Sequence, residues 1–195
     1  MWFDNVGTFI EFGFQHILPQ GLDHVLFVVA LYLNARSWSS LFLQVTTFTL
    51  AHTITLALAA TGLVSSPGDI IEPLISLSIV LLALEAIIFR KPNVWRLPVV
   101  FAFGLLHGLG FGSVMKAYLE NADLSAGLVG ITVGVEMGHV LVLVSTGIVA
   151  FLVQRGLKAI KRPGLYHNGF VMPVAAIIAL IGLYWTLQRV GFLPQ

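Results

Sequence analysis

Several ionisable side chains lie within apolar stretches of this chain, where a charge is expensive to keep. An ionisable group at the centre of a bilayer costs about 3 kcal/mol on insertion scales, so such groups pair, face a cavity or bind a ligand. Imidazole nitrogens and carboxylate oxygens together suit nickel, cobalt, zinc, iron or manganese. The sequence therefore predicts a metal site inside the membrane. The candidate ligands are Asp23, His24, His52, His107, Glu136 and His139.

The spacing of these residues strengthens the prediction. Glu136 and His139 are three residues apart, so on a helix they share one face. A Glu-x-x-His pair on one helix is how carboxylate-bridged metal sites are built in helix bundles. Thr49 precedes His52 by about one turn, and Thr55 follows it by about one turn, so their hydroxyls can line the same face. Each membrane histidine taken alone can instead simply hydrogen-bond across helices, and Asp23 can form a salt bridge with a histidine or cap the second half-helix.

Two further residues extend the candidate site into a path. His16 lies outward of the central residues and Glu85 lies inward, so together they would supply ligands at several depths. Each has a second interpretation: His16 as an interfacial residue, and Glu85 as the ion-pair partner of the basic loop at Arg90 and Lys91.

The elements that must position these residues are membrane helices. Charged residues make up 10% of the 195-residue chain and the mean hydropathy is +0.94, which excludes an ordinary soluble domain. We expect an all-α integral membrane protein in which residues 1–195 form a single polytopic domain. The prediction is a bundle of six transmembrane helices, with seven if the first half-helix crosses by itself, and the first span is broken at Pro19-Gln20-Gly21. The predicted spans cover 6–35, 41–63, 71–89, 97–115, 124–153 and 170–190.

The basic residues predict how this bundle is threaded. Eight of the ten Lys and Arg residues follow the first, third and fifth spans, and only Lys116 and Arg189 lie on the other side. Positive loops stay in the cytoplasm, so both termini are predicted to lie on the outer side of the membrane. The basic residues that follow those three spans are Arg36, Arg90, Lys91, Arg96, Arg155, Lys158, Lys161 and Arg162.

Two glycine ladders predict where helices approach closely. Gly104, Gly108 and Gly112 surround His107, and Gly130, Gly134 and Gly138 surround Glu136. Small residues at every fourth position let membrane helices pack at short range. We expect the fourth and fifth spans to pack tightly on each other.

Several motifs together resemble those of the HupE/UreJ family of bacterial membrane proteins, in its second, broader branch. The resemblance covers residues 7 to about 145 and implies a nickel or cobalt permease, with functional residues at His16, Asp23, His24, His52, His107 and Glu136. The motifs are, in order, GFQHILPQGLDHVLF, FTLAHTITLALAATGLV, IIEPLISLSIVLLALEAIIF, FGLLHGLGFG and VGVEMGH.

Two positions depart from the pattern of the family. The third-span glutamate is commonly followed by asparagine, whereas Glu85 is followed by Ala86. The fifth-span block often has asparagine and glutamine at its ends, where this chain has Thr132 and His139. Histidine is a stronger metal ligand than glutamine, so the metal preference of this chain can differ from that of other family members.

These observations leave three functions open. The first is a permease for a divalent transition metal, driven by a gradient because the chain has no ATP-binding P-loop. The second is an intramembrane zinc-type hydrolase that acts on a lipid or membrane peptide, since three histidines and a carboxylate can hold zinc and activate a water. The third is haem binding by two histidines. The net charge of +1 indicates no nucleic-acid partner, and the absence of cysteine excludes thiolate ligands. The predicted partners are a metal ion and the lipid bilayer, and the oligomeric state is not predicted.

Overall fold

The structure is a computed structural model that describes residues 2–35, 37–65, 67–89, 95–119 and 123–194. Three of the basic residues used to predict the threading, Arg36, Arg90 and Lys91, lie outside these residues. Within the described residues the chain forms seven α-helices, one π-helical turn and no strand. The elements are α1 (Trp2–Ile17), α2 (Leu22–Asn34), α3 (Trp38–Ala60), α4 (Gly68–Ile88), α5 (Arg96–Leu119), α6 (Leu124–Ala159), η1 (His167–Val171) and α7 (Met172–Arg189).

Four of these helical segments are long and apolar enough to cross a bilayer: α3, α4, α6, and η1 together with α7. The pair α1 and α2 adds a fifth segment if the two are taken as one span. In α5 the apolar stretch over Arg96–Gly112 is shorter. The all-α membrane architecture is thus confirmed, with four crossing segments or five, whereas the predicted count of six spans stays a prediction.

The break in the first predicted span lies where the sequence indicated it. α1 ends at Ile17, α2 begins at Leu22, and the two helices are bent by 71° at the break. Pro19 cannot donate a backbone hydrogen bond, which favours the end of α1. Gly21 is required there because a Cβ would overlap the carbonyl oxygen of His16. The bent pair forms either a broken span or a re-entrant loop.

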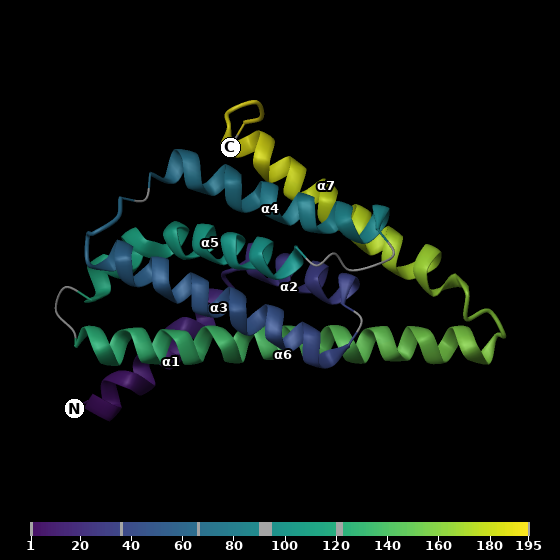
Figure 1. The fold of residues 1–195 in the computed structure, drawn as a ribbon, viewed down its shortest axis with the longest axis horizontal. Coiled ribbons are helices and arrows are strands. Elements are labelled where there is room, and N and C mark those ends of the chain that lie inside the picture. Colours follow the sequence, from purple (N-terminus) through teal and green to yellow (C-terminus); the bar gives the residue numbers. More distant parts are fainter. Residues whose placement is uncertain (1, 36, 66, 90–94, 120–122, 195) are drawn as a thin grey trace.

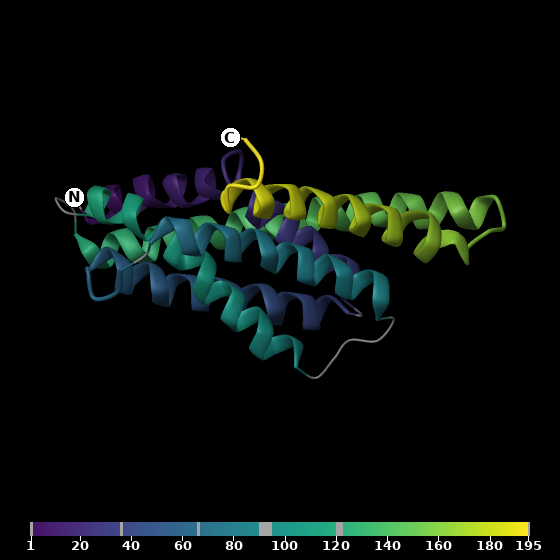
Figure 2. The ribbon, with the colours of Figure 1, turned by 90° about the horizontal axis from the view of Figure 1, so that it is seen from above.

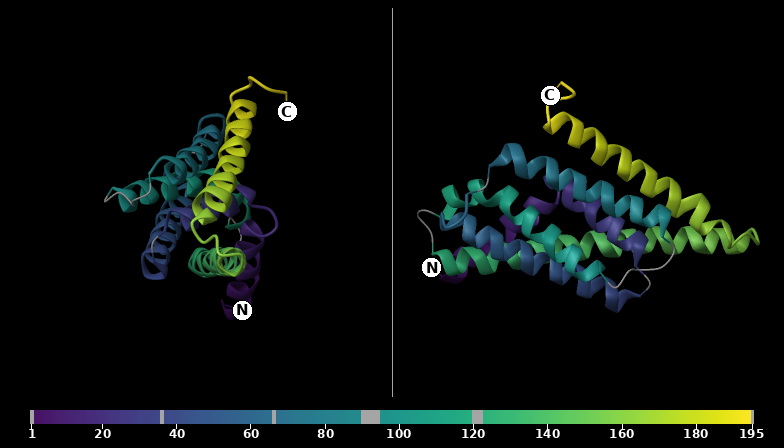
Figure 3. Two further views of the ribbon diagram at one scale, coloured as in Figure 1. Left: turned by 90° about the vertical axis from the view of Figure 1, so that its right-hand side faces the viewer. Right: turned by 45° about the horizontal axis from the view of Figure 1, so that its top comes forward.

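The helices lie roughly along one long axis of the molecule (Figure 1). With α1 and α2 taken together, successive helices run in alternating directions, as can be followed by colour in Figures 1 and 2. α2 lies inside the bundle, where it packs against α3, α4, α6 and α7. The right-hand view of Figure 3 shows it passing between α4 and α6. A residue on α2 can therefore meet side chains from most of the other helices.

The two glycine ladders pack against different partners, so the predicted packing of the fourth and fifth spans on each other is wrong. In α5, a Cβ on Gly104 or Gly108 would overlap the backbone of α3 near Phe48 and His52. In α6, a Cβ on Gly130, Gly134 or Gly138 would overlap α1. Small residues permit close approach but do not specify the partner. The outcome is an α5–α3 pair and an α6–α1 pair, which bring the chain segments that carry histidines side by side.

Candidate metal centre

His24, in the first turn of α2, is the hub of a histidine cluster. Four other imidazole rings lie around it, and their centroids are 4.9 to 5.8 Å from that of His24. They come from four more helices: His16 from α1, His52 from α3, His107 from α5 and His139 from α6. The structure thus brings histidines from five helices together, and their common depth in the bilayer stays a prediction.

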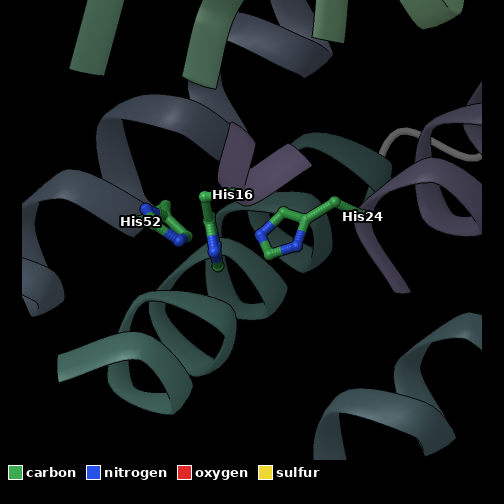
Figure 4. Close-up of side chains that lie close together, drawn as sticks. All are labelled: His16, His24 and His52. Atoms are coloured by element: carbon green, nitrogen blue, oxygen red, sulfur yellow. The ribbon is translucent and has the colours of Figure 1, made fainter. Parts of the chain in front are cut away.

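Three of these histidines form the tightest group. His16, His24 and His52 each offer a ring nitrogen, and the three nitrogens lie within 4.8 Å of one another. Figure 4 shows the three rings projecting from separate ribbons into one space. A nitrogen ligand lies about 2.1 Å from zinc and similar ions, so a small rotation of each ring brings the three nitrogens around one ion. This trio can hold a metal ion, with His107 and His139 beside it.

The outer nitrogen of His24 is fixed by its neighbour in the chain. Asp23 Oδ1 lies 3.1 Å from His24 Nδ1 and also accepts the backbone N–H of His24 at 2.8 Å. A carboxylate accepts, so we assign the Nδ1 proton to this hydrogen bond. Nε2 of His24 is then left with a free lone pair. Asp23 thus contacts His24 directly, and its own role as a metal ligand stays a prediction.

His139 is held in the same way through a hydroxyl. Thr49 donates its proton to Glu136 Oε2 at 2.6 Å, so its oxygen can only accept from His139 Nδ1, 3.0 Å away. Thr46 donates to the other oxygen of Glu136 at 2.8 Å. Both oxygens of Glu136 therefore accept hydrogen bonds from threonine hydroxyl groups. The hydroxyl of Thr49 links the carboxylate of Glu136 to His139. Such an arrangement is the usual support for a metal-binding histidine.

His107 is held by the hydroxyl of a serine, which was not predicted from the sequence. Ser78 of α4 donates its proton to the carbonyl oxygen of Ile75 at 2.7 Å and lies 3.1 Å from His107 Nε2. The serine oxygen thus accepts from Nε2, which leaves Nδ1 of His107 with the lone pair. The only signal in the sequence is a serine within an apolar span.

All five histidines keep a buried ring nitrogen that has no hydrogen-bond partner among the described residues. Buried polar atoms are nearly always paired, so each unpaired one requires an explanation. Four of the rings are also almost fully enclosed, at 0 to 2% exposure, and only His16 is partly exposed. The unpaired atoms are Nε2 of His16, His24, His52 and His139, and Nδ1 of His107.

Two phenylalanines enclose the cluster in an apolar frame. The Phe48 ring lies 5.0 to 6.3 Å from the rings of four histidines, and the Phe111 ring stacks on His16 at 3.7 Å. Apolar surroundings lower the local dielectric and keep water from the imidazole nitrogens, which strengthens their interaction with a cation.

His16 and Glu85, which were predicted to extend the site into a path, lie differently from that prediction. His16 lies in the cluster itself, not outward of it. Glu85 accepts a hydrogen bond from Arg96 at 2.7 Å, and Arg96 is buried and also donates to the carbonyl oxygen of Asn34 at 2.7 Å. Asn34 in turn donates to the carbonyl oxygen of Leu82. Glu85 thus takes part in a network that joins α2, α4 and α5. This agrees with the interpretation of Glu85 as an ion-paired residue, with Arg96 as its partner.

A cavity of about 210 Å³ adjoins the cluster, and we call it the vestibule. It is lined by Asp23 and three histidines, and by Glu72 from α4 and Arg189 from α7. Most of the lining residues are therefore polar or ionisable, which suits a hydrated ion. The remaining lining residues are Ile75, Gly110 and Phe111.

Comparison with known proteins relates the chain to one protein family. A family model described as HupE / UreJ protein matches residues 1–189, which is almost the whole chain. No curated protein and no solved structure matches the chain.

Proposed function

The chain belongs to the HupE/UreJ family, and from this premise we propose that it is a permease that binds a divalent transition metal ion at its buried histidines and moves it across the bilayer. The observation that supports the proposal most strongly is the set of five buried, unpaired imidazole nitrogens around His24. A chain with several apolar helices in this family is a multi-pass membrane protein. The family itself implies nickel or cobalt transport.

The donor set suits such an ion. Neutral imidazole nitrogens bind nickel, cobalt, zinc and iron well, and nitrogen ligands without thiolate leave the choice among these ions to geometry. His16, His24 and His52 would make the first contacts because their nitrogens are already close together. His107 and His139 would complete the shell after small movements. The carboxylates of Asp23 and Glu136 would stabilise the bound charge from outside the shell.

The course of the ion follows from the cavity and the break. Interrupted membrane helices recur at the substrate sites of transporters, where they provide polar backbone at mid-depth. The ion would enter the vestibule, pass Asp23 and reach the histidines. Beyond them lies the network of Arg96, Glu85 and Asn34, which would have to open for release.

The direction follows from the charge distribution. The described basic residues Arg96, Arg155, Lys158, Lys161 and Arg162 follow the predicted third and fifth spans, whereas Arg189 lies at the end of the predicted sixth span and lines the vestibule. Positive residues mark the cytoplasmic side, so the vestibule would face outward and transport would be import. This orientation requires the six-span threading, with both termini outside the inner membrane.

The test is uptake of labelled nickel and cobalt into liposomes that contain the purified protein. We expect uptake by the wild type, and none by His52→Ala or His107→Ala, because each removes a buried ligand. Thr146→Ala is the control, since its hydroxyl donates to the backbone carbonyl oxygen of Val142 on its own helix. If well-folded wild type moved no divalent ion, the permease would be refuted. The hydrolase and haem alternatives are not favoured, because the family implies transport.

A further inference from the structure

One ion pair lines the vestibule together with the histidines. Arg189, the last residue of α7, donates from Nη1 to the backbone carbonyl oxygen of Glu72 at 2.8 Å. Its Nε lies 3.9 Å from the carboxylate oxygen Oε2 of Glu72. Of the two carboxylates that line the vestibule, Glu72 is more exposed than Asp23. A positive and a negative group thus stand together at the more exposed carboxylate, which a cation from the solvent would meet first.

The two partners are held very differently. The guanidinium of Arg189 is fixed by the carbonyl and lies over the Trp185 ring, 5.8 Å from its centroid. One turn earlier, Thr186 bonds to Ser76 at 3.0 Å and anchors the end of α7 on α4. The carboxylate of Glu72, by contrast, is 58% exposed and only loosely paired. An exposed ion pair of this length contributes little to stability, so its carboxylate can readily leave Arg189 for another cation.

From this geometry we propose that Glu72 and Arg189 form a cation-operated latch, in which Glu72 is the first group to bind the incoming metal ion and Arg189 is the charge that the ion must displace. The inference rests on the proposed transport function. A divalent ion attracts the Glu72 carboxylate more strongly than a guanidinium 3.9 Å away. When Glu72 binds the ion, the pair separates and Asp23, whose side chain is 23% exposed, becomes the next carboxylate along the vestibule.

In the proposed latch, the positive charge of Arg189 limits the access of the metal ion to the vestibule. The packing of the Arg189 side chain does not. A fixed charge of the same sign at the mouth of a cleft lowers the local concentration of an ion and slows its association. Removing that charge should therefore speed binding at low salt. The gain should shrink in high salt, because exposed charges are screened over about 10 Å or less.

The experiment is stopped-flow binding of cobalt(II) to the purified protein in detergent, followed by the visible absorption of the bound ion. We expect Arg189→Gln to raise the association rate roughly tenfold at low salt, and Arg189→Lys, which keeps the charge, to stay within about twofold of wild type. Glu72→Gln should slow association, and it keeps the backbone carbonyl that holds Arg189. The matched control is Arg155→Gln, an exposed arginine on α6 away from the vestibule.

The outcomes separate the latch from the function on which it rests. Wild type without a cobalt spectrum would refute the metal site itself. Wild type that binds cobalt, with an unchanged or slower rate in Arg189→Gln, would overturn the latch alone. The same holds if Arg189→Lys speeds binding as much as Arg189→Gln, because loss of packing would then explain both. If Arg189→Gln fails to fold, an unaltered association rate in Glu72→Gln overturns the proposal.

Discussion

At the scale of single residues, three of the five clustered histidines have one ring nitrogen held by a neighbouring side chain and one buried nitrogen without a partner among the described residues. The holding groups differ: a carboxylate for His24, a threonine for His139 and a serine for His107. In each case the partner can only accept, which fixes the tautomer and the ring orientation before any ion arrives. The site is therefore organised in advance by groups that need not contact the ion.

Ser78 provides the sharpest test of this organisation. Replacing Ser78 by alanine removes the acceptor of His107 Nε2 but leaves the imidazole in place. We expect metal affinity to fall about 10- to 100-fold, the usual effect of losing such a support, while the protein still inserts and folds. Isothermal titration with cobalt(II) measures the affinity, and Thr146→Ala is the control. An affinity equal to that of wild type would mean that Ser78 does not orient His107.

The histidines themselves were predictable because an ionisable group in an apolar run stands out in the sequence. The residues that hold these histidines by hydrogen bonds were harder to predict. Thr49 was found by its spacing from His52, although its partners are Glu136 and His139 on α6. Ser78 was missed, because serine is common in membrane helices and nothing local distinguishes it. His16 was predicted to lie outward of the break, but the size of the bend, 71°, could not be predicted, and the His16 ring centroid lies 4.9 Å from that of His24.

At the scale of helices, glycines decide which segments lie side by side. Gly134 shows this most clearly: a Cβ there would overlap the carbonyl oxygen of Ile10 and lie 2.7 Å from the backbone nitrogen of Phe14. Backbone cannot move aside as a side chain can, so α1 and α6 would have to separate. His16 is carried by α1 and His139 by α6, so the spacing of this pair also sets the spacing of two candidate ligands.

Gly134→Ala should therefore destabilise the protein by about 1–3 kcal/mol, the usual cost of overpacking. The measurement is the free energy of unfolding in detergent, with cobalt affinity measured alongside, which should also fall. Gly156→Ala is a matched control on the same helix, because a Cβ there meets nothing within 4 Å. Equal stability of the two variants would contradict close packing of α1 on α6.

The break of the first helix was predictable from Pro19 and Gly21, since the reasons are local. The partners of the two glycine ladders were not, because a ladder shows that a helix can be approached closely but not by which helix.

At the scale of the whole molecule, the open question is how the chain is threaded through the bilayer. The described helices alternate in direction when α1 and α2 are taken together, which agrees with the six-span prediction. The length criterion alone gives four segments, or five with the bent pair. The difference lies in α5, whose apolar stretch over Arg96–Gly112 is shorter than the other segments, and the six-span count stays a prediction.

The chain has no cysteine, so single cysteines report accessibility without background. We expect Ser65→Cys and Gly7→Cys to react with a membrane-impermeant maleimide in intact cells whose outer membrane has been opened. Ser39→Cys and Gly164→Cys should react only after the inner membrane is broken. All four positions are exposed. Labelling of Gly7→Cys from the same side as Ser39→Cys would show that α1 and α2 form a re-entrant loop instead of a broken span.

The break between α1 and α2 also gives the site an electric field of its own. A helix carries about half a negative charge at its carboxyl end and half a positive charge at its amino end. α1 ends at the cluster, with His16 in its last turn, so its negative end meets the space between the rings. The positive end of α2 arrives there as well, but Asp23 in its first turn offsets it. An unbroken helix would place neither terminus in the bilayer, so a single interruption places a field that attracts cations in the space between the imidazole rings.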